Sequence, residues 1–145
     1  MPGRYGAKKY KPHKSSVSKL IYTAVYRCDG CGAQYRKKPG QCADKNCGGM
    51  AFTHFHSIAE ANRWSLLLIL QAQGRISNLR RQVRIPLHAA GINGKTKVCT
   101  YVLDFRYDRD AEDVWEDTKG GMTDVASLKL KWVKAEYGVE VLLTK

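Results

Sequence analysis

The chain has 145 residues and a mass of 16.3 kDa, which is enough for one domain with a single core and a small appendage. No run approaches the roughly 20 consecutive apolar residues that cross a bilayer, so a membrane-spanning helix is excluded. The 25 Lys and Arg exceed the 13 Asp and Glu and give a net charge of +12, which points to an anionic partner.

The positive charge is concentrated at the N-terminal end. Residues 1–50 contain eleven basic and two acidic residues, a net +9, whereas residues 51–145 contain fourteen basic and eleven acidic residues. We expect residues 1–20 to form a basic arm, and the tyrosines interleaved with this charge favour nucleic acid as its partner. The alternative is a solvated basic face with structural tyrosines. The candidate DNA-binding residues are Lys8, Lys9, Lys11, Lys14, Arg36, Lys37 and Lys38.

Four cysteines in residues 21–56 have the spacing of a zinc ribbon. They are Cys28, Cys31, Cys42 and Cys47, in the pattern C-x2-C-x10-C-x4-C. Two close pairs of thiolates match the tetrahedral shell of a structural Zn²⁺, which leaves no position open for a substrate. Two disulfides are the alternative, but they need an oxidising compartment. Because the second pair is wider than usual, His54 or His56 in place of one thiolate also stays open.

Residues 57–145 predict an α/β domain. Apolar periodicity indicates a helix over 57–73, with Ser57 as its N-cap and Gly74 at its end. Strand patterns follow at 80–87, 98–107 and 114–119, then a helix over 124–137 and a strand over 139–143. Short turns predict an antiparallel meander of three strands. The second helix then returns the last strand parallel to its neighbour, which gives a mixed sheet.

Three side chains of this sheet suggest a metal-dependent site. Asp117 and Lys119 are two residues apart on one strand and share a face, and Asp104 on the preceding strand lies beside them in a hairpin. Asp104 is embedded in an apolar run, where an unpaired carboxylate is costly. Two carboxylates converging with a lysine favour Mg²⁺ or Mn²⁺ between the carboxylates and a phosphate substrate. The alternative is a solvated Asp–Lys pair without chemistry.

Two further side chains lie close enough to this site to be candidates for it. Glu116 competes with Asp117 as the acid before the lysine, but strand alternation directs it to the face opposite Lys119. Gln82, on the first strand, is within reach of the site or of a substrate, although a plain position on the sheet surface is the simpler interpretation.

The chain resembles the PD-(D/E)XK nuclease superfamily over residues 57–145. The stretches that carry the resemblance are SIAEANRW, GRISNLRRQVRIPL, YVLDFRY, VWEDTKGGMT and SLKLKW, and they are similar to a small phage-type branch that is related to archaeal-type Holliday junction resolvases. The resemblance implies a restriction-endonuclease-like α-β-β-β-α-β core. In it, Asp104 is the acid of the second strand and Asp117-Thr118-Lys119 the (D/E)-x-K motif.

The resemblance also implies a third metal ligand on the first helix, where Glu60 stands. Catalytic residues would then be Glu60, Asp104, Asp117 and Lys119, with the ion held by the three acids. Glu60 has an alternative, because Ser57-Ile58-Ala59-Glu60 also reads as a capping box.

These observations together predict a Mg²⁺-dependent DNA endonuclease with a zinc ribbon before its core. The resemblance implies a DNA substrate that is branched, such as a Holliday junction or other branched DNA, or duplex. It also implies a homodimer and a role in phage recombination or repair. We expect a cytoplasmic protein, in the bacterial host if a phage encodes it, because the N-terminus lacks the apolar segment of a secretory signal. The alternative is a non-catalytic zinc-ribbon adaptor that binds nucleic acid on a degenerate nuclease scaffold.

Overall fold

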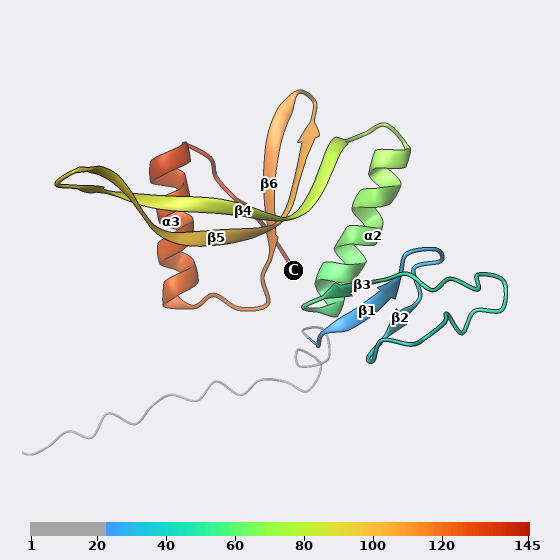
Figure 1. Cartoon of the computed structure of the whole chain (residues 1–145). Helices are drawn as coiled ribbons and strands as arrows, with labels where there is room; N and C mark the ends of the chain where they lie inside the picture. Colours follow the sequence, from blue (N-terminus) through green and yellow to red (C-terminus); the bar gives the residue numbers. More distant parts are fainter. Residues whose placement is uncertain (1–22) are drawn as a thin grey trace, which may run out of the picture.

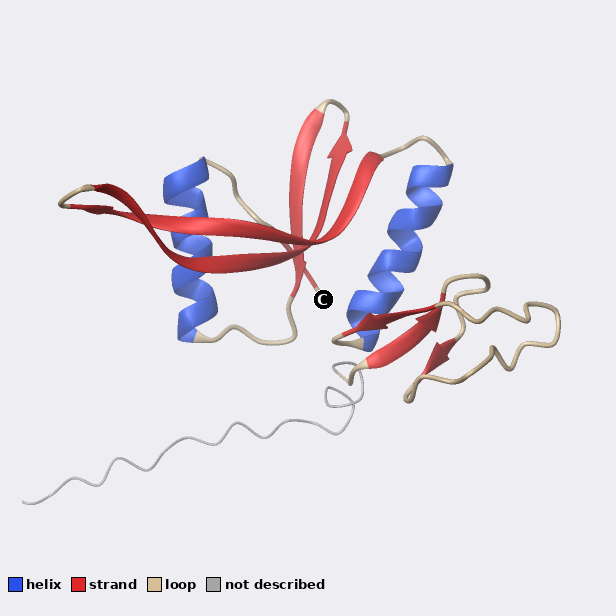
Figure 2. Ribbon diagram, viewed as in Figure 1, coloured by secondary structure: helices blue, strands red, loops and turns tan. Residues whose placement is uncertain are grey.

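The computed structural model describes residues 23–145, which form two β-sheets and two helices (Figure 1). The smaller sheet lies beside the N-terminal half of α2, and the larger sheet extends from α2 to α3 (Figure 2). Neither helix of this described part is long and apolar enough to cross a membrane.

The smaller sheet carries the cysteine-rich loops. Its strands are β1 (Val25–Cys28), β2 (Gln34–Tyr35) and β3 (Phe52–Phe55), antiparallel in the order β2-β1-β3. Val25 and Phe55 are buried against Ala61 of α2. Hydrogen bonds from Arg27 to Ser65 and from Gln34 to Asn62 join the same two elements. The small sheet is therefore docked onto the helix that begins the larger unit.

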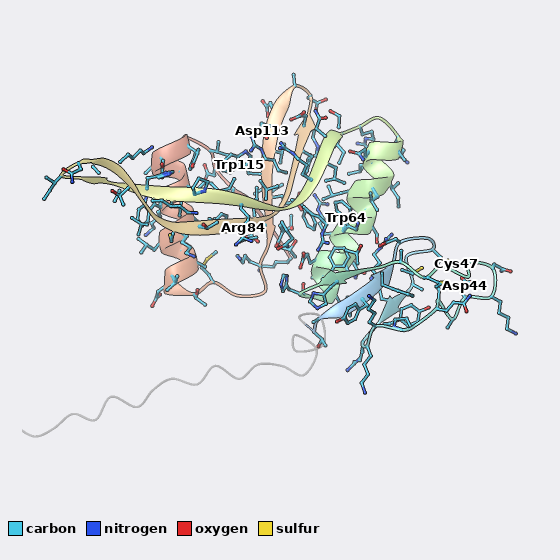
Figure 3. The ribbon with its side chains drawn as sticks, in the orientation of Figure 1. Asp44, Cys47, Trp64, Arg84, Asp113 and Trp115 are labelled. Atoms are coloured by element: carbon cyan, nitrogen blue, oxygen red, sulfur yellow. The ribbon has the colours of Figure 1, made fainter. Side chains whose placement is uncertain are left out.

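Helix α2 (Ile58–Ala72) confirms the predicted helix and both of its ends. The Ser57 hydroxyl accepts a hydrogen bond from the Glu60 N–H at 3.0 Å, and Gly74 follows the helix with a left-handed φ of 70°. On the inner face, Leu67 is fully buried and Trp64 stacks on Phe105 with ring centroids 5.9 Å apart (Figure 3). This face fixes α2 against the larger sheet.

The larger sheet has the predicted topology. Its strands are β4 (Ser77–Gly91), β5 (Gly94–Arg109), β6 (Glu112–Thr118) and β7 (Leu142–Thr144), in the order β4-β5-β6-β7. The first three form an antiparallel meander, and β7 is parallel to β6 after the crossover through α3 (Asp124–Tyr137). The element order α-β-β-β-α-β and the mixed sheet confirm the α/β prediction.

The strand boundaries differ from the prediction in a physically simple way. We expected a broad turn at AAGINGKT, but β4 and β5 pair up to Gly91 and Gly94, and Ile92 and Asn93 alone make the turn. Gly94 supplies the φ of 104° that closes so short a turn. Similarly, Asp110 and Ala111 have φ values of 52° and 65°, which define a two-residue turn between β5 and β6. The predicted strand 139–143 is shifted and shortened to 142–144.

Two apolar clusters hold the larger sheet to its helices. One contains Leu87, Leu103, Trp115 and other buried residues that pack against Val133 of α3. The other packs Phe105 and Tyr107 against Leu67 of α2. The two helices thus restrain different ends of the meander, and the polar pocket described next lies where β4, β5 and β6 meet the start of α2.

Candidate functional site

The acids singled out in the sequence converge on one pocket of about 360 Å³. The N-terminal end of α2 forms one wall, and β4, β5 and β6 form the others. Its lining residues are His56, Ser57, Glu60, Gln82, Val102, Asp104, Thr118 and Lys119. Asp117 lies beneath this lining and is 1% exposed. The structure therefore brings Glu60, Asp104, Asp117 and Lys119 together from three separate elements.

Asp104 is held by the backbone of the neighbouring strand. The pairing of Phe105 with Glu116 sets Asp104 opposite Asp117, and Asp104 Oδ2 accepts a hydrogen bond from the Thr118 N–H at 2.8 Å. Burial, together with the hydrogen bond and charge of Asp117, raises the pKa of Asp104 to about 8. Near neutral pH the proton on Asp104 therefore removes the repulsion from Asp117, and a bound cation would be an alternative to this proton.

Asp117 has one satisfied oxygen and one oxygen without a partner. Oδ2 lies 2.9 Å from Lys119 Nζ and also accepts a hydrogen bond from the Tyr101 hydroxyl. Burial and this bond to Asp117 raise the pKa of Tyr101. Oδ1 is buried and has no hydrogen-bond partner among the described residues. A buried carboxylate oxygen without a donor is costly, so this atom marks a position suited to a bound cation.

Glu60 is 2% exposed and belongs to both the helix start and the pocket. Its Oε2 accepts the His56 N–H at 3.0 Å, one residue before the bond expected from a capping box. Its Oε1 faces the pocket, where it accepts a hydrogen bond from Gln82 Nε2 at 3.0 Å and lies 3.7 Å from Arg81 Nη2. Oε2 therefore stabilises the segment that leads into α2, and Oε1 belongs to the acidic cluster of the pocket.

Gln82 belongs to the pocket, although a simple position on the sheet surface was the expected one. Its Nε2 donates to Glu60 at 3.0 Å and approaches Asp104 Oδ1 at 3.4 Å, so the amide bridges two carboxylates. Its φ of 52° is left-handed, which is costly for a residue with a Cβ. No sequence pattern predicts this conformation. It leaves Gln82 without a paired residue on β5, between the pairs of Arg81 and Val83.

Glu116 faces away from the pocket, as strand alternation predicted. Arg63 Nη2 donates to its Oε2 at 2.9 Å, the Tyr107 hydroxyl donates to the same oxygen at 2.7 Å, and Thr144 donates to Oε1 at 3.2 Å. This fully buried carboxylate is thus completely paired. These bonds indicate a structural role for Glu116, whereas Asp117 has one oxygen without a partner.

The three pocket acids offer the oxygen ligands that Mg²⁺ prefers. Magnesium binds oxygen ligands and usually combines one or two carboxylates with water and phosphate oxygens. Asp117 Oδ1 lacks a donor, and both Glu60 Oε1 and Asp104 Oδ1 share a single amide nitrogen. These oxygens have the chemistry of a Mg²⁺ ligand set, but in residues 23–145 only the cysteine sulfurs are gathered within metal-binding distance of one another.

The four cysteines form a second, separate cluster. Their Sγ atoms all lie within 4.8 Å of one another, and no other such group of metal-ligating side chains occurs in residues 23–145. Sγ–Sγ distances are 3.7 Å for Cys28–Cys47 and 3.5 Å for Cys31–Cys42. A tetrahedral ion with bonds of about 2.3 Å requires sulfurs about 3.8 Å apart. The cluster therefore fits a four-thiolate metal site, and the thiols are free rather than paired as disulfides.

The thiols of this cluster are shifted in different directions. The backbone N–H of Cys31 lowers the pKa of the Cys28 thiol to about 7, whereas hydrogen bonds between thiols and burial raise the pKa values of Cys31 and Cys47. A Cβ on Gly30 would lie 2.9 Å from Cys47 Sγ, and one on Gly49 would lie 3.1 Å from Cys28 Sγ. A Cβ at Gly30 would therefore force the sulfur or the backbone to shift, whereas one at Gly49 would be tight. The open alternative, in which a histidine replaces one thiolate, is not supported by this geometry.

His54 and His56 instead follow the small sheet toward the acidic pocket. The His54 ring contacts Tyr26 at 5.0 Å and His56 at 5.6 Å between centroids. Arg81 extends from β4 back to the small sheet: its Nη2 donates to the His54 carbonyl at 2.9 Å, and its guanidinium lies 4.3 Å from the centre of the Phe55 ring. These contacts connect the cysteine-bearing sheet physically to the pocket.

A larger hollow of about 740 Å³ lies between the end of α2 and the β5–β6 turn. Two of its three acids have partners: Asp113 is paired with Arg106 at 2.7 Å, and Asp108 accepts from Asn78, while Asp110 is exposed in the turn. The larger hollow therefore has paired or exposed acids, whereas the smaller pocket has a buried carboxylate oxygen without a partner.

The candidate DNA-binding residues fall in two groups. Lys8, Lys9, Lys11 and Lys14 lie outside the described residues. Arg36, Lys37 and Lys38 are exposed on the loop that follows β2.

A family model described as "Protein of unknown function (DUF1064)" matches residues 49–144. The chain belongs to the DUF1064 family. The DUF1064 match spans both helices, the four-stranded sheet and every residue of the acidic pocket, and it begins after the fourth cysteine. The cysteine cluster thus precedes the matched region. No curated protein and no solved structure matches the chain.

Proposed function

We propose that this DUF1064 protein is a divalent-metal-dependent DNA endonuclease with a PD-(D/E)XK-type core and a structural zinc ribbon. The observation that carries the proposal is the convergence of Glu60, Asp104, Asp117 and Lys119, with Asp117 Oδ1 buried and unpartnered. The element order and the parallel last strand support the same superfamily.

The carboxylates and the lysine have distinct roles in this proposal. When bound, Mg²⁺ would supply a positive charge that stabilises the phosphate as negative charge develops. Glu60 Oε1, Asp104 Oδ1 and Asp117 Oδ1 would hold it. Lys119, held 2.9 Å from Asp117, would orient the attacking water. The water oxygen forms a new bond to phosphorus and one bridging P–O bond breaks. The proton of the attacking water passes to bulk solvent, and the departing oxygen takes up a proton from solvent.

The cysteine cluster is proposed to hold one structural Zn²⁺. Four thiolates complete its shell, so the ion would stabilise the loops rather than take part in cleavage. The basic residues 1–20 and the loop with Arg36, Lys37 and Lys38 would bind the DNA backbone. A branched substrate, a homodimer, a cytoplasmic location and a role in phage recombination or repair remain proposals that come from the superfamily resemblance.

The test incubates wild-type protein with labelled four-way junctions and with linear duplex, in Mg²⁺, in Mn²⁺ and without either ion. We expect cleavage with either metal and a preference for the junction. Asp117→Asn and Lys119→Ala should bind DNA and reduce cleavage by about 100-fold or more. A wild-type protein that binds DNA but cuts with neither metal would instead support the non-catalytic adaptor.

A further inference from the structure

The β4–β5 hairpin projects from the larger sheet, beyond α3, as a two-stranded arm (Figure 1). All residues from Ala89 to Val98 are exposed, and Ile92 at the tip is 105% exposed. We propose that this arm lies along duplex DNA beside the scissile site and inserts its tip into a groove. The inference rests on the proposed function and adds where the DNA lies.

The base of the arm is fixed, so its direction is set by the fold. The Glu136 carboxylate on α3 accepts the His88 N–H at 2.9 Å and lies 2.7 Å from Lys95 Nζ. The Trp132 indole N–H donates to the His88 carbonyl at 2.9 Å, and the Tyr137 hydroxyl donates to the Pro86 carbonyl at 2.6 Å. A register shift between Leu87 and His88 marks the point where the arm leaves the helix.

The charge of the arm matches a polyanion. Residues 89–98 contain Lys95 and Lys97 and no Asp or Glu, and Lys95 is paired with Glu136 of α3. Arg84 and Lys97 are exposed on the hairpin, and neither is in an ion pair within the described residues (Figure 3). An unpaired basic edge also discourages pairing with another sheet, but a fully exposed isoleucine between the two strands does not serve that purpose.

The shape of the arm favours a DNA groove over a flat surface. A two-stranded β-ribbon fits the major groove, and apolar side chains can insert between base steps. From Gln82 in the pocket to Gly91 the strand advances nine residues, or about 30 Å at roughly 3.3 Å per residue. Since B-DNA rises about 3.4 Å per base pair, the tip would meet the duplex about nine base pairs from the cut.

The test uses full-length, zinc-loaded protein without Mg²⁺, so that binding is measured apart from cleavage. Ile92 is replaced by the photo-crosslinking residue p-benzoylphenylalanine, and the complex with a four-way junction of 20-base-pair arms is irradiated. We expect a crosslink within a duplex arm, about nine base pairs from the position that wild-type protein cuts in Mg²⁺. Leu66 on α2, which is 45% exposed, carries the same probe as a control and should not crosslink.

A charge-reversal pair provides the second measurement. Lys97→Glu should weaken junction binding by about tenfold and make the salt dependence shallower by about one to two ions. Arg75→Glu, an exposed arginine after α2, changes the net charge equally and should have a much smaller effect. Both sites are exposed, so equal melting temperatures will show that each variant folds.

Equal crosslinking from Ile92 and Leu66, or equal losses in Lys97→Glu and Arg75→Glu, would overturn the role of the arm. A junction crosslink from Ile92 without cleavage in any metal would retain the arm as a DNA-binding element and reject the endonuclease. Cleavage without a crosslink from Ile92 would retain the endonuclease and reject the arm as a DNA-binding element. Absence of DNA binding would reject the arm and the endonuclease alike.

Discussion

Glu60 on α2 and Asp104 on β5 share a single hydrogen-bond donor, the amide nitrogen of Gln82, at 3.0 and 3.4 Å. The amide lies between two carboxylates that would otherwise repel each other. Gln82 reaches this position with a left-handed backbone conformation, so β4 is strained beside Glu60 and Asp104. A divalent ion bound there would take over the role of this donor.

We therefore expect Gln82→Ala to reduce the free energy of unfolding by about 1 kcal/mol when Mg²⁺ and Mn²⁺ are absent, because both carboxylates lose their shared donor. Adding Mn²⁺ should close most of this gap. Thermal unfolding in resin-treated buffer, with and without Mn²⁺, measures both effects. Gln71→Ala is the control, because it removes a hydrogen bond to the Leu79 N–H outside the pocket. If Mn²⁺ restores the free energy of unfolding equally in Gln82→Ala and Gln71→Ala, Gln82 does not bridge the metal ligands.

The pKa of Asp104 gives a pH-dependent prediction. In the folded chain it is raised from 3.8 to about 8, so the folded state binds the extra proton between about pH 4 and pH 8. Stability of the protein without Mg²⁺ should consequently fall as the pH rises through this window. Asp104→Asn should unfold with nearly the wild-type free energy near pH 4 and be more stable by about 1–2 kcal/mol near pH 9.

Urea unfolding of zinc-loaded protein across this pH range measures the difference. Asp110→Asn, in the exposed β5–β6 turn, controls for the loss of one negative charge. A difference between Asp104→Asn and wild type that stays constant from pH 4 to pH 9 would contradict the raised pKa.

Glu116 and Asp117 are adjacent in sequence, but we expect opposite effects from their substitution. Glu116→Gln breaks the buried pair with Arg63 and should reduce the free energy of unfolding by about 2–4 kcal/mol. It should leave the cleavage rate of the folded protein near that of wild type. Asp117→Asn should retain the fold and lose cleavage. Urea unfolding and single-turnover cleavage of both variants test this separation, and loss of cleavage in folded Glu116→Gln would contradict it.

The contrast between these two residues shows what the sequence could predict. Alternation along β6 was enough to separate Asp117 from Glu116, because neighbouring side chains of a strand point to opposite faces. The topology followed equally from periodicity and short turns. The bridging by Gln82 could not be predicted, since it depends on a left-handed backbone and on contacts with α2 and β5. The extent of the hairpin was also missed, because Ala89 and Gly91 are poor strand formers in isolation.

The cysteine cluster predicts a steric requirement that is independent of cleavage. A Cβ at position 30 would lie 2.9 Å from the Sγ atom of Cys47, whereas one at position 40 meets nothing within 4 Å. Gly30→Ala should therefore lower the zinc content well below one ion per chain, and Gly40→Ala should leave it near one. Elemental analysis of protein purified without chelators measures both. Equal zinc contents in the two variants would show that the close backbone approach is not required.

The central claim is that the acidic pocket cuts DNA. Its most direct measurement is the single-turnover cleavage of a labelled four-way junction in Mg²⁺ by zinc-loaded wild type and by Asp117→Asn, at protein concentrations where both bind the junction fully. We predict metal-dependent cleavage by the wild type and a rate at least about 100-fold lower for the variant. Equal cleavage by the two proteins, or no cleavage by fully bound wild type in Mg²⁺ or Mn²⁺, would contradict the claim.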